Sequence, residues 1–136
     1  MKLIAFLNKT RNEEYRRQMD ELPCGGDCGY ANGYVAVPPE HPYHGVDYDK
    51  LLVDVHGGLT FDTSAKEINN AIQSGLWRDI EFLGEDTELH DDYWVFGFDT
   101  LHCDDSLTNW PRERCIEETL RLKEQLEKMS NNIVFK

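Results

Sequence analysis

Two short polar clusters in the sequence contain the residue types that bind metal ions or transfer protons. The first is VHGGLTF, residues 55–61, in which His56 is followed by two glycines. The second is GFDTLHCDD, residues 97–105, in which Asp99 and His102 lie three residues apart and two more aspartates follow. Imidazole nitrogens and carboxylate oxygens are ligands for zinc, manganese and iron, and a metal bound by them can activate water.

The two clusters predict one set of catalytic candidates. If the segments that precede His56 and Asp99 are neighbouring strands, then His56, Asp99 and His102 converge at one edge of the sheet. All three are then candidate ligands for a divalent metal as cofactor. Without a metal, Asp99 is a candidate to orient His102 as a general base. The purely structural alternatives are a His102 ring bonded to a backbone carbonyl and an Asp105 side chain that caps a turn.

A second set of residues is predicted to bind a ligand. The two glycines after His56 either offer backbone N–H groups to an anion or form a β-bulge. Tyrosines and histidines around the proline-rich loop at 38–45 suit a flat ligand, or they form a loop packed by its own tyrosines. The predicted ligand-binding residues are Tyr34, His41, Gly57, Gly58, Thr60 and Asp105.

Composition limits the classes of partner. The 136 residues carry a net charge of −12, which argues against a nucleic-acid binder, because such proteins use a basic face. The sequence has no apolar run of 18 residues, so no membrane span is predicted. The apolar patch at residues 3–7 is too short for a secretory signal, which predicts a cytoplasmic protein with reduced cysteines. A small molecule or a host protein is the predicted partner.

Hydrophobic spacing and turn residues predict the elements that must position these groups. The segment 63–75 has the signature of a short helix, with Ser64 as N-cap and Glu67 three residues later. The run at 93–101 is the most apolar and is predicted to be the central strand. Further predictions are a helix at 9–22, strands at 33–38 and 50–58, a strand or extended connector at 77–84, a long helix from about Pro111, and a short strand at 132–136.

These elements predict a single domain over residues 1–136 with an α+β fold. The expected architecture is a small, mainly antiparallel sheet packed by two or three helices, one of them the long C-terminal helix. Along that helix Cys115, Thr119, Leu122 and Leu126 share one face, which indicates a helix that covers a sheet.

Two strings in the sequence also resemble a family of small bacterial and phage proteins of uncharacterised function. They are CGYANGYVAVPPEHPYHGVDYDKLLVDVHGGLTF at 28–61 and YWVFGFDTLHCDD at 93–105, in the same order as in that family. The resemblance implies a common fold and a common site, but no particular activity. Mapped onto this sequence, the implied site residues are Cys28, His41, His56, Gly57, Gly58, Thr60, Asp99, His102 and Asp105.

Three functions follow as alternatives. The first is a bacterial or phage accessory protein that binds a small, nucleotide-like ligand or a partner at a cleft lined by histidine and aspartate. The second is a small metal-dependent hydrolase that uses His56, Asp99 and His102. The third is a scaffold without a site. The hydrolase requires His56 and His102 within reach of each other, the binding module requires a tyrosine-lined cleft, and the scaffold requires both histidines buried and separately paired.

Overall fold

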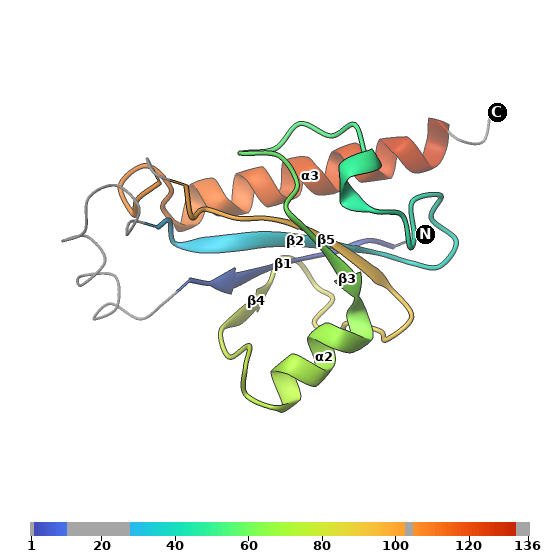
Figure 1. Ribbon diagram of the computed structural model, residues 1–136, viewed down its shortest axis with the longest axis horizontal. Helices are drawn as coiled ribbons and strands as arrows, with labels where there is room; N and C mark the ends of the chain where they lie inside the picture. The colour runs from blue at the N-terminus through green and yellow to red at the C-terminus, as the bar shows by residue number, and fades with distance from the viewer. Residues whose placement is uncertain (1, 11–27, 103–104, 133–136) are drawn as a thin grey trace.

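A five-stranded antiparallel sheet between two helices makes up the described part of the chain (Figure 1). The computed structural model describes residues 2–10, 28–102 and 105–132. The strand order is β3-β5-β2-β1-β4. In chain order the elements are β1 (Ile4–Lys9), β2 (Ala31–Val37), the 3₁₀ turn η1 (Tyr48–Lys50), β3 (Phe61–Ser64), α2 (Ala65–Gln73), β4 (Ile80–Phe82), β5 (Trp94–Phe98) and α3 (Arg112–Asn132). The predicted α+β class, with its antiparallel sheet and long C-terminal helix, is confirmed.

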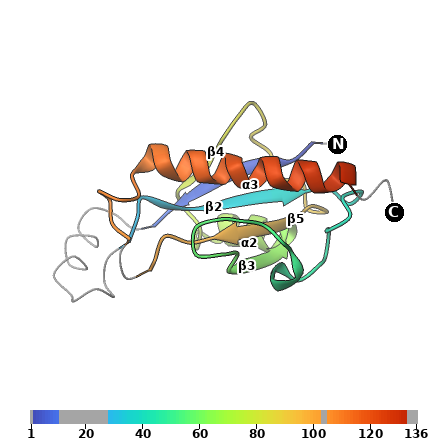
Figure 2. The same cartoon turned by 90° about the horizontal axis from the view of Figure 1, so that it is seen from above.

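The two faces of the sheet build two cores, because successive side chains of a strand point to opposite sides. Val35 of β2 belongs to a core with Leu122 and Leu126 of α3. Its neighbour Tyr34 belongs to a core with Ile68 of α2. The helices therefore lie on opposite faces of the sheet, and α3 runs beside β2 for much of its length (Figure 2).

The apolar face predicted for α3 is buried as expected. Cys115, Thr119, Leu122 and Leu126 are all fully buried. Burial of a leucine side chain contributes about 1.5–3 kcal/mol each, so this face holds the helix firmly on the sheet. None of the helices among the described residues has the length and hydropathy needed to cross a membrane.

The helix α2 begins and ends where the sequence predicts. The Ser64 hydroxyl accepts a hydrogen bond from the Glu67 amide across 3.3 Å, as an N-cap does. After the helix, Gly75 has φ +82° and its amide bonds the Ile72 carbonyl, which closes the last turn.

Two strands complete the sheet at one side. β1 coincides with the N-terminal apolar patch, which sequence analysis did not assign to a strand. Residues 3–7 are all buried, so both faces of β1 are covered and the polar alternation that marks a half-exposed strand is missing. β4 shows that the segment 77–84 contains a strand, one of its two predicted alternatives. The run at 93–101 forms β5, which has neighbours on both sides, although β2 is the central strand.

The strand predicted at 50–58 is wrong. Residues 51–60 form no strand, and the sheet is rejoined only at Phe61, the first residue of β3. The backbone groups of this segment bond to side chains of α3 instead: the Asp54 amide donates to Gln125 Oε1 and the His56 amide to Glu118 Oε2, both across 2.7 Å. These side chains satisfy the amides of Asp54 and His56, which a neighbouring strand would otherwise have to bond.

Two predicted elements cannot be compared with the structure. Apart from residues 9 and 10, the helix predicted at 9–22 lies outside the described residues, and Lys9 belongs to β1. Residues 133–136 of the predicted terminal strand also lie outside them, and Asn132 ends α3.

Candidate functional site

A tight glycine turn presents His56. The Gly58 amide donates to the Val55 carbonyl across 2.9 Å, and φ is +70° at Gly57 and +77° at Gly58. Residues with a Cβ atom rarely adopt this left-handed conformation. The two glycines therefore form the turn that orients His56. Because the Gly58 N–H is already bonded to Val55, Gly58 does not offer its amide to an anion.

The first of the two glycines also makes room for His102. A Cβ atom built on Gly57 would overlap Cε1 and Nε2 of the His102 ring, whereas one built on Gly58 would meet nothing within 4 Å. Gly57 is therefore needed for both its conformation and its missing side chain. The two polar clusters, residues 55–61 and 97–105, converge as the sequence predicts. The centroids of the His56 and His102 rings lie 4.8 Å apart in an edge-to-face arrangement.

Asp105 joins the two histidines. Its Oδ1 lies 2.8 Å from His56 Nε2, and its Oδ2 lies 2.8 Å from His102 Nδ1. Oδ2 also accepts the His102 amide across 2.9 Å. The residue is only 2% exposed, so its carboxylate is removed from water and depends on these partners. A carboxylate accepts hydrogen bonds, so each ring can donate to Asp105 through the nitrogen that faces it.

Asp99 lies at the margin of this cluster. Its Oδ2 accepts the Thr60 hydroxyl across 2.9 Å, and its Oδ1 accepts the Leu101 amide across 3.1 Å. The distance from Oδ1 to His102 Nδ1 is 3.7 Å, longer than that from Asp105. Asp99 and Thr60 therefore join the two loops, and Asp105 is the carboxylate that both imidazoles share.

The His56 ring rests on Trp110, the last residue but one before α3. The two ring centroids are 4.1 Å apart with an interplanar angle of 35°. The guanidinium of Arg114 also lies 4.1 Å from the centre of the Trp110 ring. Trp110 is 5% exposed, which leaves little of its surface for a ligand to stack on. The tryptophan thus supports His56 from the side of α3.

Glu118 of α3 holds the backbone of His56. In addition to the His56 amide, its carboxylate accepts two hydrogen bonds from the Arg121 guanidinium, each across 2.9 Å. Partial burial raises the pKa of Glu118, but the bonds from Arg121 and the His56 amide lower it by more, so the net pKa is below the ordinary value. Glu118 is therefore an ionised acceptor at neutral pH.

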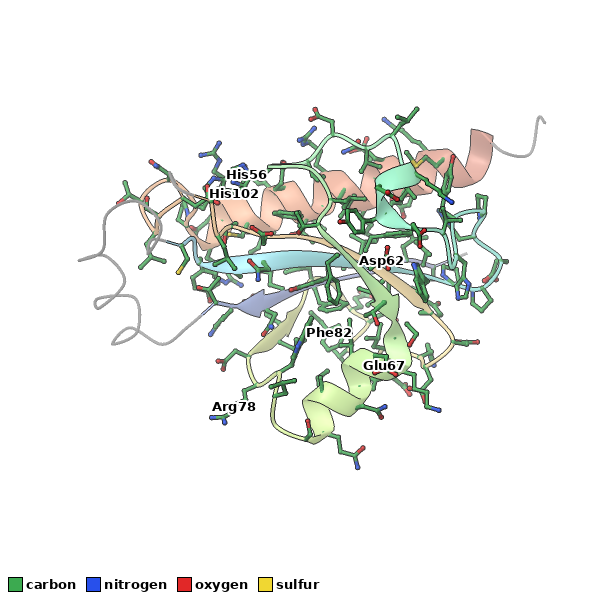
Figure 3. The ribbon with its side chains drawn as sticks, viewed as in Figure 1. His56, Asp62, Glu67, Arg78, Phe82 and His102 are labelled. Atoms are coloured by element: carbon green, nitrogen blue, oxygen red, sulfur yellow. The ribbon has the colours of Figure 1, made fainter. Side chains whose placement is uncertain are left out.

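A pocket opens beside His56. It has a volume of about 370 Å³, and its lining includes His56, Trp110, Arg114 and Glu118. This volume lies at the lower end of the range for small-molecule sites. Figure 3 shows His56 and His102 side by side next to the first turns of α3.

Tyr34 and His41 lie elsewhere. Tyr34 is in the core under α2, where burial raises its pKa to about 12. His41 is buried, and its Nε2 bonds the Leu126 carbonyl across 2.8 Å while its Nδ1 accepts the Tyr43 amide across 3.0 Å. Both residues are satisfied by the fold itself. Cys28, which the family resemblance implied as a site residue, is buried and bonds Thr10 Oγ1 across 3.6 Å.

The donor set of the cluster suits a divalent transition metal. One ligand atom each from His56, His102 and Asp105 lies within 4.8 Å of the other two. A tetrahedral zinc ion with bonds of about 2.0–2.1 Å separates its ligand atoms by about 3.3 Å. The two ring-to-carboxylate distances are 2.8 Å, so the ion would require these atoms to spread by about 0.5 Å and would replace the protons on the two ring nitrogens that face Asp105. Two imidazoles and one carboxylate are also a ligand set found in catalytic metal sites.

Sequence analysis missed the contributions of Trp110 and Glu118. The tryptophan was not considered as a site residue, and Glu118 belongs to the charged face of α3, which reads as a solvated surface. A signal does exist in retrospect: Glu118, Arg121 and Gln125 follow one another at spacings of three and four, so they lie on one side of the helix.

Comparisons with protein-family models, with curated proteins and with solved structures gave no match for this chain.

Proposed function

We propose that this protein is a small metal-dependent hydrolase, with one divalent ion held by His56, His102 and Asp105. The observation that carries the proposal is the convergence of two imidazoles on a single buried carboxylate, with all three ligand atoms within 4.8 Å. Compared with the set expected from the sequence, Asp105 takes the place of Asp99 as the carboxylate ligand. The side chains of His56 and His102 are 24% and 38% exposed, so water can reach the ion.

The chemistry follows from the ligand set. Three protein ligands leave a zinc-type ion with an open position for water, and the ion lowers the pKa of that water to about 7. An ion held by His56, His102 and Asp105 would therefore supply an activated water for the hydrolysis of an ester. The pocket of about 370 Å³ borders His56, one of the three proposed ligands, and has the volume of a small-molecule site.

The two alternatives fit the geometry less well. A scaffold requires histidines that are buried and separately paired, whereas His56 and His102 are partly exposed and share one partner. A tyrosine-lined module requires tyrosines at the cluster, but Tyr34 is buried on the α2 side and Tyr43 and Tyr48 pack against the other core. A non-catalytic binding protein that uses the same pocket is the second candidate, and the activity measurement below separates it from the hydrolase.

The test is titration of metal-free protein with Zn²⁺ and Mn²⁺ by calorimetry. We expect one site per chain, and we expect His56→Gln, His102→Gln and Asp105→Asn each to weaken binding by at least about 100-fold, since each removes one of three ligands. His44→Gln is the matched control, because the His44 ring bonds the Asp92 carbonyl, away from the cluster. Absence of binding, or equal binding by all four variants, would contradict the metal site.

Hydrolysis is then measured on p-nitrophenyl acetate, p-nitrophenyl phosphate and bis-p-nitrophenyl phosphate, with and without the metal that binds. We expect turnover of at least one ester that is lost in His102→Gln. Stoichiometric metal binding without turnover of any of these esters would favour the non-catalytic binding protein.

A further inference from the structure

We infer that three polar residues on one side of α3, Glu118, Arg121 and Gln125, position His56 in the site. We call them the α3 ladder. They bond the segment 54–56 at both ends, and the segment itself belongs to no strand. The inference rests on the proposed function, because the geometry that the ladder fixes is that of a metal ligand.

The ladder takes the place of a neighbouring strand. The Gln125 side chain bonds both backbone groups of Asp54: its Oε1 accepts the amide across 2.7 Å and its Nε2 donates to the carbonyl across 2.9 Å. About two helical turns earlier, Glu118 accepts the His56 amide across 2.7 Å. Amides two residues apart are thus bonded by side chains seven residues apart on α3, which fixes the path of the chain into the glycine turn.

Arg121 keeps the acceptor in place. Its Nε and one terminal nitrogen each bond the Glu118 carboxylate across 2.9 Å, and the other terminal nitrogen bonds Asp54 Oδ2 across 3.1 Å. A bidentate pair of this kind has a defined orientation, unlike a single contact. The Glu118 side chain is 14% exposed, so it is less screened than a surface carboxylate.

Glu118 acts through His56 rather than as a ligand. Among the described residues, the group of converging ligand atoms contains His56, His102 and Asp105 but not Glu118. His56 is consequently held at two points: Glu118 fixes its backbone amide, and Asp105 fixes its ring. Residues that orient a metal ligand in this way typically change metal affinity by about 10–100-fold when removed.

Two substitutions at one position separate the acceptor from the charge. Glu118→Ala removes the acceptor of the His56 amide, whereas Glu118→Gln keeps an oxygen that can accept it. We expect Zn²⁺ affinity to fall about 10–100-fold in Glu118→Ala and to remain near that of wild type in Glu118→Gln. Glu124→Ala is the control, since Glu124 lies on the same helix and pairs with Lys128 on the surface.

A second measurement needs no metal. In the metal-free protein, we expect amide hydrogen exchange to be slow at His56 in wild type and Glu118→Gln and faster in Glu118→Ala, with the cross-relaxation between the His56 and Trp110 rings lost only in Glu118→Ala. If the wild-type protein binds no metal but the three proteins show this pattern of amide exchange, the proposed function is refuted and the positioning role of Glu118 stands. Equal Zn²⁺ affinity and equal exchange in wild type and Glu118→Ala would overturn the inference.

Discussion

At the scale of single residues, the site depends on how one buried carboxylate is shared. Asp105 serves two imidazoles and one amide, and it is almost completely buried. Asp99 is closer to solvent, and its side chain bonds Thr60 and a backbone amide. Burial makes each hydrogen bond of Asp105 more costly to lose, because water cannot replace the missing partner.

The two aspartates therefore predict different stabilities for the same chemical change. Asp105→Asn leaves an amide group whose NH₂ faces a ring N–H, so at least one bond to the charged acceptor is lost. We expect it to lower the free energy of unfolding by about 1.5–3 kcal/mol, measured by urea denaturation. Asp99→Asn, the matched control, should lower it by less than about 1 kcal/mol. Equal effects of the two changes would contradict the role given to Asp105.

The glycine pair allows a similarly matched comparison. Gly57→Ala and Gly58→Ala both place a Cβ atom in the left-handed region, at a cost of about 1–2 kcal/mol. Only Gly57→Ala also drives that atom into the His102 ring. We expect both variants to lose stability, but only Gly57→Ala to weaken Zn²⁺ binding strongly. A loss of binding of the same size in Gly58→Ala would mean that the turn, and not the close approach, limits the site.

At the scale of elements, some segments are determined by local sequence signals and others by contacts with distant parts of the chain. The α2 helix is defined locally by its cap, Ser64, and by the buried face that includes Ile68. The segment before His56 is defined by α3, since Glu118 and Gln125 bond its backbone. The alternating apolar residues at 51–55 are typical of a strand. The same pattern arises whether the backbone is bonded by a neighbouring strand or by helix side chains, so the pattern alone does not predict which of the two is present.

The cap of α2 can be tested directly. Ser64→Ala removes the acceptor of the Glu67 amide, and we expect a loss of about 1 kcal/mol in the free energy of unfolding. Ser74→Ala, at the other end of the helix, is the control, because its hydroxyl donates to a carbonyl on the exposed surface and should contribute less. Urea denaturation of the two variants should therefore give different midpoints, and matching midpoints would argue against the cap.

At the scale of the whole molecule, the sequence predicted the fold class and the convergence of the two polar clusters that contain His56 and His102. Helical periodicity revealed α2 and α3, each of which has one face in a core, whereas β2 and β5 have both faces in cores and were predicted from their apolar runs. β1 was not predicted because its short apolar run, residues 3–7, was compared only with a secretory signal. Of the candidate site, the approach of His56 and His102 was predicted, and Asp105 was predicted as a ligand-binding residue but not as their shared partner. The choice of Asp105 over Asp99 depends on a three-dimensional turn that residue spacing does not encode, and Glu118 comes from a helix more than 60 residues away in the chain.

The stability of the whole molecule should also depend on pH through His41. Burial lowers the pKa of His41 below 6.5, more than its bond to the Leu126 carbonyl raises it, and nearby His44 lowers it further. The unfolded chain therefore takes up a proton at about pH 6.5, before the folded protein does. Between the two pKa values the unfolded state binds more protons, so the contribution is fully present above pH 6.5 and is lost as the pH falls through the folded value.

We expect the free energy of unfolding to fall between pH 7.5 and pH 5.5, with His41 adding a slope of at most about 1.4 kcal/mol per pH unit. This range lies above the titration of Glu118, whose lowered pKa makes its own contribution disappear only below pH 4.5. His41→Gln cannot titrate, so its slope should be smaller than that of wild type, whereas His44→Gln should keep most of it. Since His56 and His102 are present in all three proteins, the difference in slope isolates His41. Identical slopes in wild type and His41→Gln would show that burial of the charged His41 ring costs the folded protein nothing, and would remove the pH sensitivity assigned to it.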